Sequence, residues 1–303
     1  MRLLILAAFL SAPSIASAHG VPIELSVADG SLTVSHFEND YGPYIIGQVE
    51  DESDPIGPIS LPGVGNALLW GLPGIDITGM VGTASLVLEP IAHDFGGAMQ
   101  TLWYWDPFSR HVTPTPQGTT LVLQLSDRDV TLSNSGIAAP ITLAETVAGE
   151  TGYHNHSLVD FAMPYSGTIL AGLYGFFARL SSNEYAPSEQ FLITFNAGAN
   201  YEDLAPASEA IWLAANPGDY TLDGVVDAAD YDVWVNHYGE VPAMAQTAAD
   251  GNGDGVVDAA DYTLWRDNLS TPAVRAPEPG AMFLLGVAFV GSAVRTARST
   301  NRK

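Results

Sequence analysis

The sequence contains no cysteine, so disulfide bonds, thiolate zinc sites and a cysteine nucleophile are all excluded. A small domain in this chain must be stabilised by something else, and a bound metal ion is the first candidate. Basic residues are scarce as well: there are 10, against 34 acidic residues, and the single lysine is Lys303. The net charge of −24 excludes a general nucleic-acid-binding protein, because affinity for phosphate requires clustered Lys and Arg.

Hydrophobic residues make up 47% of the chain, enough to bury a sizeable core and to argue against wholesale disorder. A length of 303 residues exceeds one average domain, so we expect one large globular unit and something smaller. The sequence has no Gly-rich phosphate loop, no GxSxG nucleophile elbow and no HExxH zinc motif. Whether the protein is an enzyme is therefore left open.

Residues 1–18 have the pattern of a secretory signal peptide. Arg2 precedes the apolar run Leu3–Leu10, and the segment ends in the small residues Ala16-Ser17-Ala18. Small side chains at these positions fit signal peptidase, so we expect cleavage after Ala18 and export of the protein. A retained membrane anchor is the alternative, although the apolar run is well short of the ~20 residues that a bilayer span needs.

Residues 272–303 combine a proline-flanked triplet, an uncharged stretch and a basic tail. These are Pro277-Glu278-Pro279, residues 280–294, and a tail with Arg295, Arg298, Arg302 and Lys303. The arrangement resembles the PEP-CTERM sorting signal. The resemblance implies transient anchoring by a transmembrane helix, cutting near the triplet by an exosortase, and delivery to the cell surface or beyond. As a helix the uncharged stretch spans roughly 22 Å, which snorkelling arginines can extend. A plain anchor without processing is the alternative.

A duplication between residues 219 and 270 is the strongest chemical signal. Residues 219–230 recur as residues 250–261, and the nine residues Asp223–Tyr231 are identical to Asp254–Tyr262. Each copy places oxygen-bearing side chains at loop positions 1, 3, 5, 9 and 12 and glycine at position 6, the spacing with which EF-hand-type loops bind Ca²⁺. The predicted ligands are Asp219, Thr221, Asp223, Val225 (carbonyl), Asp227 and Asp230 in the first loop, and Asp250, Asn252, Asp254, Val256 (carbonyl), Asp258 and Asp261 in the second.

Both loops end in Asp rather than in the bidentate Glu of EF-hands, and Thr221 offers a neutral hydroxyl at position 3. We therefore expect the first site to be the weaker one. Residues 231–238 and 262–269 follow the loops with helical apolar spacing, and two such helices can bury one face against each other.

Two loop-plus-helix units within residues 217–271 resemble a type I dockerin domain. The resemblance implies a small α-helical module that folds on two Ca²⁺ ions and docks onto a cohesin domain of another protein. It also implies that partner choice depends on the pair before the last ligand, here Ala228-Ala229 and Ala259-Ala260. Because both pairs are small and apolar, we expect a hydrophobic contact that either repeat can make. A purely structural calcium module without a cohesin partner is the alternative.

Residues 19–203 show short β-rich runs with Gly and Pro between them and no long helical period. This pattern predicts a mainly β domain, an antiparallel β-sandwich resembling a jelly roll. The segments around 172–180 and 188–196 are expected to pair as a closing hairpin, and residues 55–62 and 113–118 to be turns. Residues 204–216 are expected to form a linker with a short helix, Leu204–Ala215. The other predicted strands cover residues 31–37, 44–49, 84–91, 98–105, 119–125, 130–133 and 157–163.

Two side-chain groups in the β-domain are candidates for binding. Trp103-Tyr104-Trp105 offers flat faces on which sugars could stack, but on a strand Trp103 and Trp105 share one face, and aromatic strands are more often core. His154 and His156 lie at i, i+2 spacing, so a divalent metal such as zinc is conceivable together with His93, Asp94 or His111, with surface histidines as the alternative.

Two functions from different classes follow. The first is an exported, calcium-binding protein of the cell surface or extracellular matrix, whose dockerin-like module docks it and whose β-domain acts in adhesion or glycan binding. The second is a carbohydrate-active subunit, a glycoside hydrolase or polysaccharide-binding protein recruited through its dockerin. Dockerins commonly accompany glycoside hydrolases, so hydrolysis of O-glycosyl bonds is the expected reaction if the protein is an enzyme. Paired catalytic carboxylates cannot be identified from spacing. We favour the first function, because a β-domain of under 200 residues with no recognisable catalytic motif is small for most such enzymes.

Overall fold

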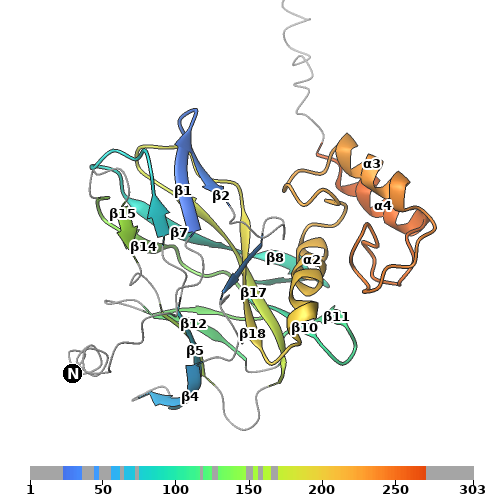
Figure 1. The fold of residues 1–303 in the computed structure, drawn as a ribbon, viewed down its shortest axis with the longest axis horizontal. Helices are drawn as coiled ribbons and strands as arrows, with labels where there is room; N and C mark the ends of the chain where they lie inside the picture. Colours follow the sequence, from blue (N-terminus) through green and yellow to red (C-terminus); the bar gives the residue numbers. More distant parts are fainter. Residues whose placement is uncertain are drawn as a thin grey trace, which may run out of the picture. The chain divides into compact units, whose positions relative to one another are not determined.

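The computed structural model describes residues 23–35, 44–47, 56–61, 65–71, 75–116, 119–124, 129–147, 153–155, 160–164 and 170–270, and Figure 1 shows them in colour. The signal peptide with Ala18, the sorting segment with Pro277, Glu278 and Pro279, and His156 lie outside these residues. No helix in the described part of the chain is long and apolar enough to cross a membrane.

The described part of the chain is mainly β (Figure 1), and its strands form four sheets. The largest has seven strands: β11 (His111–Thr113), β10 (Trp103–Asp106), β17 (Gly172–Ser181), β18 (Phe191–Ala197) and β3 (Tyr44–Gly47) in that order, with β7 (Leu86–Ile91) pairing with β17 and with β14 (Ile141–Ala144). A five-stranded sheet has the order β13 (Asp129–Leu132), β12 (Leu121–Gln124), β16 (Asp160–Pro164), β5 (Gly65–Gly71), β4 (Ile56–Leu61).

A four-stranded sheet has the order β15 (Tyr153–Asn155), β6 (Ile75–Ile77), β1 (Ile23–Ala28), β2 (Ser31–Ser35), and β8 (His93–Phe95) pairs with β9 (Ala98–Gln100). Most pairs are antiparallel; β1 with β6 and β18 with β3 are parallel. The helices are the 3₁₀ turn η1 (Tyr201–Asp203), α2 (Leu204–Ala215), α3 (Ala228–His237) and α4 (Ala259–Asn268). The predicted mainly β class with antiparallel sheets is confirmed. The packing of two sheets as a jelly roll stays a prediction.

Several local predictions are confirmed. β17 and β18 form the expected hairpin, with Phe176 opposite Ile193, and the expected short helix is α2, Leu204–Ala215. Rather than serving as a linker, α2 buries most of its residues, including Ile211 and Trp212. β1 was not predicted. The turn Asp29-Gly30 joins it to β2, and both residues have positive φ, 50° and 80°, as in a type I′ hairpin turn.

Two predictions about strands are wrong. The single strand expected over residues 98–105 is two strands, because the amides of Thr101 and Leu102 both donate to the carbonyl of Ser133, at 3.0 Å each, and leave the ladder. Residues 55–62, expected as a turn, hold β4. A strand with Pro58 is tolerated here because β4 lies at the edge of its sheet and its register shifts between Ile56 and Ile59.

β17 is covered on both faces, and this position divides the interior into two cores. Alternate residues of β17 point to opposite sides: Tyr174 and Phe176 belong to one core, and Leu173 and Phe177 to the other. The second core also contains Trp103 and Trp105 of β10 and the buried side of α2, as well as Tyr220, Met244, Ala249 and Val257 from the segment after α2. The β-domain and the segment after α2, as far as Asn268, belong to one compact unit.

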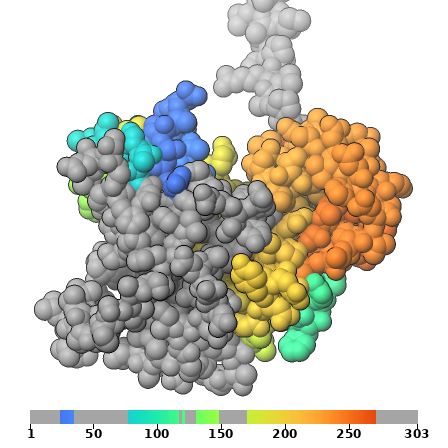
Figure 2. All heavy atoms as spheres, in the orientation of Figure 1, coloured from blue at the N-terminus to red at the C-terminus, as the bar shows by residue number. Residues whose placement is uncertain are grey.

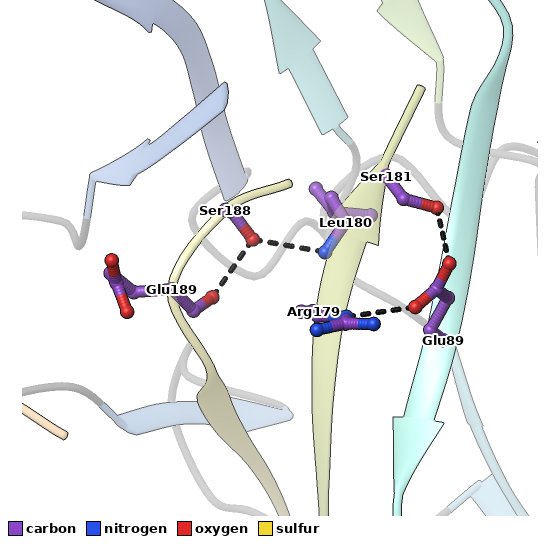
Figure 3. A network of polar contacts seen from close by, with 6 residues as sticks. All are labelled: Glu89, Arg179, Leu180, Ser181, Ser188 and Glu189. Carbon is purple, nitrogen blue, oxygen red and sulfur yellow. Dashed lines mark hydrogen bonds and ion pairs between the residues drawn. The ribbon is translucent and has the colours of Figure 1, made fainter. Parts of the chain in front are cut away.

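A polar network ties β7 to β17 beside the first core (Figure 3). Arg179 Nε donates to Glu89 Oε2 at 2.8 Å, and Ser181 Oγ donates to Glu89 Oε1 at 2.6 Å. Ser188 Oγ accepts from the amide of Leu180 at 2.9 Å and donates to the carbonyl of Glu189 at 2.8 Å, which closes the hairpin loop onto β17. The bonds from Ser181 and Arg179 hold the pKa of Glu89 below its ordinary value of 4.5.

Replacement of Glu89 by Gln is expected to lower the free energy of unfolding by about 1 kcal/mol at neutral pH, since a partly exposed ion pair contributes that much at most. A lowered native pKa stabilises the fold above the unfolded-state value, and this contribution disappears as pH falls through the native pKa. The difference between wild type and Glu89→Gln should thus be full above pH 4.5 and shrink below it. Urea unfolding at several pH values measures this. Glu189→Gln, an exposed change, is the control, and a pH-independent difference would contradict the expectation.

Candidate metal centre

The two duplicated loops lead directly into helices, and the same hydrogen bonds start both helices. In the first loop Asp227 Oδ1 accepts from the amide of Ala229, and Asp230 Oδ2 accepts from the amide of Asp227, both at 2.7 Å, which makes a capping box at the start of α3. In the second loop Asp258 and Asp261 make the matching bonds at 2.7 Å at the start of α4. The aspartates at positions 9 and 12 therefore also serve as helix caps.

The first and last predicted ligands of each loop are completely buried: Asp219, Asp230, Asp250 and Asp261 have no exposed surface. Glycine at position 6 has a positive φ in both loops, 85° at Gly224 and 87° at Gly255, so the sharp turn predicted from the sequence is present. The amide of each glycine donates to Oδ2 of the first aspartate, at 2.8 Å in the first loop and 3.0 Å in the second. The duplication in sequence is therefore a duplication in structure.

Burial of the aspartate carboxylates in these loops has an electrostatic cost. Desolvation raises the pKa of Asp219 and that of Asp261, and the neighbouring carboxylates Asp230 and Asp250, respectively, raise them further, while hydrogen bonds to each carboxylate oppose the shift. Eleven acidic residues lie between Asp219 and Asp267, with Arg266 as the only basic one. A cation placed between the buried carboxylates would remove this cost.

Asp250 supplies direct support for a ligand. Its Oδ1 is buried without a hydrogen-bond partner among the described residues, whereas its Oδ2 accepts from the amides of Gln246 and Gly255. A buried carboxylate oxygen without a donor is costly unless a cation coordinates it. The predicted set around it consists of carboxylate, amide and carbonyl oxygens, the donors that Ca²⁺ prefers.

The carboxylates are not gathered into a ready cluster. Within the described ranges no three His, Cys, Asp or Glu side chains stand close enough together to hold a metal ion. Instead Asp223 Oδ1 and Asp254 Oδ1 accept from the amides of Val225 and Val256, at 2.8 and 3.1 Å, and lie on the exposed side of their loops. The complete ligand set stays a prediction, and closing it would require these two side chains to turn inward.

The loops differ at position 3, where the sequence suggested a weaker first site. Thr221 Oγ1 donates to Asp230 Oδ1 at 2.9 Å, so its hydroxyl is already bonded to another predicted ligand. Asn252 instead donates its amide group to Asp254 Oδ2 at 2.9 Å and accepts on Oδ1 from the amide of Asp254. Both side chains hold the loops in shape, and the ranking of the two sites stays a prediction.

Indole groups brace the loops, a role that the sequence did not reveal. Trp234 on α3 donates to the carbonyl of Asp258 in the second loop at 2.8 Å, and Trp265 on α4 donates to the carbonyl of Asp227 in the first loop at 2.5 Å. Their rings pack with Tyr231 and Tyr262 between the helices, which lie side by side in Figure 1. The predicted apolar helix faces thus meet, and each helix also supports the loop of the other repeat.

Residues 217–270 match the family model of the Dockerin type I domain. The match covers 54 of the 303 residues, and it includes both loops and both helices. No curated protein and no solved structure matches the chain. The C-terminal described segment is accordingly a dockerin-type docking module, as the repeated loops predicted.

The dockerin module exposes both residue pairs that were predicted to contact a partner. Ala228, Ala229, Ala259 and Ala260 are all exposed at the helix starts. Other exposed apolar side chains of the module are Val225 and Val256 at position 7 of the loops, Val235 on α3 and Tyr238 at the C-cap of α3. Figure 2 draws the atoms of the module in orange and red. The module therefore presents an apolar face to solvent in both repeats.

The three aromatic residues that were candidates for sugar stacking are buried in the β-domain. Trp103, Tyr104 and Trp105 are 0%, 5% and 0% exposed, so they are core residues and cannot stack on a sugar. As the strand period predicted, Tyr104 faces the first core and both tryptophans face the second. Stacking on this triad is thus excluded because strand β10 lies in the middle of its sheet, covered on both faces.

Among the described residues, the candidate zinc ligands lie on strands of separate sheets. His93 and Asp94 lie on β8, His111 on β11 and His154 on β15, in three different sheets. His93 packs its ring against Phe177 with the centroids 4.6 Å apart, and burial lowers its pKa. The ring nitrogens of His111 lie 2.6 Å from the carbonyl of Ser109 and 3.1 Å from that of Gly253. These two histidines are packing and bracing residues.

Proposed function

We propose that the chain is an exported protein that docks onto a cohesin-type domain through its dockerin module and that this module binds two Ca²⁺ ions. The observation that carries the proposal is the pair of matching loops with four completely buried aspartates, one of which has an oxygen without a donor. Dockerin domains bind cohesins, typically bind calcium and occur in extracellular proteins, and the match over residues 217–270 supports the same for this chain.

Calcium would supply positive charge at the centre of each loop, where the aspartates crowd. Asp219 and Asp250 would contribute the first carboxylates, and Asp230 and Asp261 the last. The remaining predicted ligands are Thr221, Asp223, the Val225 carbonyl and Asp227, and Asn252, Asp254, the Val256 carbonyl and Asp258. Because the last aspartates also cap α3 and α4, an ion held by them would stabilise the helix starts together with the loops.

Calorimetric titration of the whole chain with Ca²⁺ is expected to show two binding events. Asp250→Ala with Asp261→Ala should remove the tighter event, and Asp219→Ala with Asp230→Ala the weaker one, because each pair closes one loop. Asp232→Asn, which changes an exposed carboxylate of α3 outside the predicted ligand set, should leave both events intact. If the Asp219 and Asp230 pair removes the tighter event, the ranking of the loops is wrong. A chain that takes up no Ca²⁺ would refute the proposal.

For docking, we propose that the two exposed alanine pairs form equivalent contacts with the partner. Replacement of one pair by Arg, either Ala228 and Ala229 or Ala259 and Ala260, should leave binding of a cohesin domain measurable. Replacement of all four alanines by Arg should abolish it. Since all four residues are exposed, Ca²⁺ uptake should be unchanged in each variant. Surface-immobilised cohesin measures this. Abolition by a single pair would contradict equivalence, and Ca²⁺ uptake without any cohesin binding would establish the purely structural calcium module.

For the β-domain we retain the proposal of adhesion or glycan binding at the cell surface, with a carbohydrate-active subunit as the alternative. The docking module supports this proposal, and the sequence has no GxSxG nucleophile elbow and no HExxH motif. Because the tryptophan triad is buried, a glycan would have to bind elsewhere on the domain.

A glycan array and a polysaccharide reducing-end assay on the whole chain separate these two possibilities. We expect binding without turnover, and turnover would establish the carbohydrate-active alternative. Trp105→Phe should leave glycan binding unchanged, because this ring has no exposed surface.

We further propose that signal peptidase cuts after Ala18 and that an exosortase cuts near Pro277-Glu278-Pro279 after transient anchoring by residues 280–294. The support is the sequence pattern at each end: small residues before the first cut, and an uncharged stretch with a basic tail after the second.

A further inference from the structure

Helix α2 lies outside residues 217–270, yet its packing connects the β-domain to the calcium loops. Its buried residues share one core with Trp103, Trp105 and Phe177 of the β-domain, and with Tyr220, Met244 and Val257 of the dockerin module. Glu209 of α2 accepts from the amide of Ala248, two residues before the second loop, at 2.7 Å. α2 is therefore part of the structural support of the loops.

Trp212 is the residue of α2 that touches a predicted ligand. Its side chain is completely buried, and its ring lies 5.5 Å from that of Phe177 on β17, measured between centroids. Its Nε1 donates to Asp219 Oδ2 at 2.8 Å, inside the protein. One face of the indole thus contacts the β-domain while its N–H fixes the first carboxylate of the first loop.

In the second loop, no indole of the described residues donates to the carboxylate of the first aspartate. Asp250 Oδ2 accepts from the amide of Gln246 at 3.2 Å, where Asp219 Oδ2 accepts from Trp212. Gln246 in turn accepts on Oε1 from the amide of Val112 on β11, at 3.1 Å. A side chain from outside the dockerin module therefore bonds directly to a predicted ligand in the first loop. At the second loop, the described hydrogen bonds from outside the module instead go to Gln246, Ala248 and Gly253, which are not predicted ligands.

We propose that Trp212 is a positioning residue for the calcium ligand Asp219, and that Ca²⁺ binding in the first loop is thereby coupled to the stability of the β-domain. The inference rests on the proposed calcium binding. A buried hydrogen bond to one oxygen of a carboxylate orients that carboxylate, and the position of a ligand oxygen decides how well it coordinates Ca²⁺. Linkage requires the coupling to be reciprocal, so an ion that fixes Asp219 also stabilises whatever packs against Trp212.

Trp212→Phe removes the N–H and keeps most of the ring. Because Asp219 then loses the bond that orients its carboxylate, the affinity of the first loop should fall about tenfold or more. Each loop is measured alone by calorimetry on the whole chain: the first in an Asp250→Asn background and the second in an Asp219→Asn background. The affinity of the second loop should change less than about twofold.

Trp105→Phe is the matched control. Trp105 is a completely buried tryptophan of the same core whose Nε1 has no hydrogen-bond partner, so the change makes a similar cavity without taking a bond from Asp219. It should lower the unfolding temperature and leave first-loop affinity unchanged. Equal weakening by both variants, or equal weakening of both loops by Trp212→Phe, would show a merely structural role. Unchanged first-loop affinity in Trp212→Phe would also overturn the proposal, whereas wild type that binds no Ca²⁺ would overturn the proposed function instead.

Hydrogen exchange on the wild-type chain tests the coupling without any variant and remains informative if Trp212→Phe fails to fold. With Ca²⁺ added, amide protection should rise in the first loop, along α2, and in β10 and β17, which carry Trp103, Trp105 and Phe177. Protection confined to residues 217–270 would contradict the coupling.

Discussion

Four aspartate carboxylates, at the first and last positions of the two loops, are withdrawn from water, and the surrounding structure is arranged to compensate their charge. Backbone amides of the loops donate to three of them on both oxygens, and Asp250 is bonded on one oxygen only. Burial of a charge without such partners would cost several kcal/mol. The capping of α3 and α4, the glycine turns and the proposed affinity for Ca²⁺ all follow from this constraint.

The compensation extends beyond the duplicated segment. Trp234 and Trp265 exchange indole bonds between the repeats, so neither loop is supported by its own helix alone. Trp212 adds a bond from α2, a helix that also packs against β10 and β17 of the β-domain. Tryptophan suits this task because a single side chain buries a large apolar surface and carries one N–H donor. The docking module and the β-domain thus share a core through α2.

Prediction from the sequence succeeded where the signal is local. The loops, their glycines and the helices after them were found because the motif lies within a dozen consecutive residues and occurs twice. The β17–β18 hairpin and α2 were found because each is formed by neighbouring residues of the chain. Strands β1, β4, β5, β6, β8, β11, β14 and β15 were missed, since several have only three or four residues and β4 contains a proline. The break between β9 and β10 could not be seen either, because it depends on Ser133, which is distant in the chain.

By itself, the sequence determined the chemistry of the duplicated loops, because ligand spacing within a short segment is set by the covalent chain. It also determined that Trp103 and Trp105 share one face of a strand, since side chains alternate. Only the tertiary structure decided that both faces of β10 are covered, which removed the tryptophans from the candidates for glycan binding. It also decided that an indole seven residues before the first loop bonds to Asp219. Burial and hydrogen bonds between elements depend on which surfaces meet, and no local pattern carries that information.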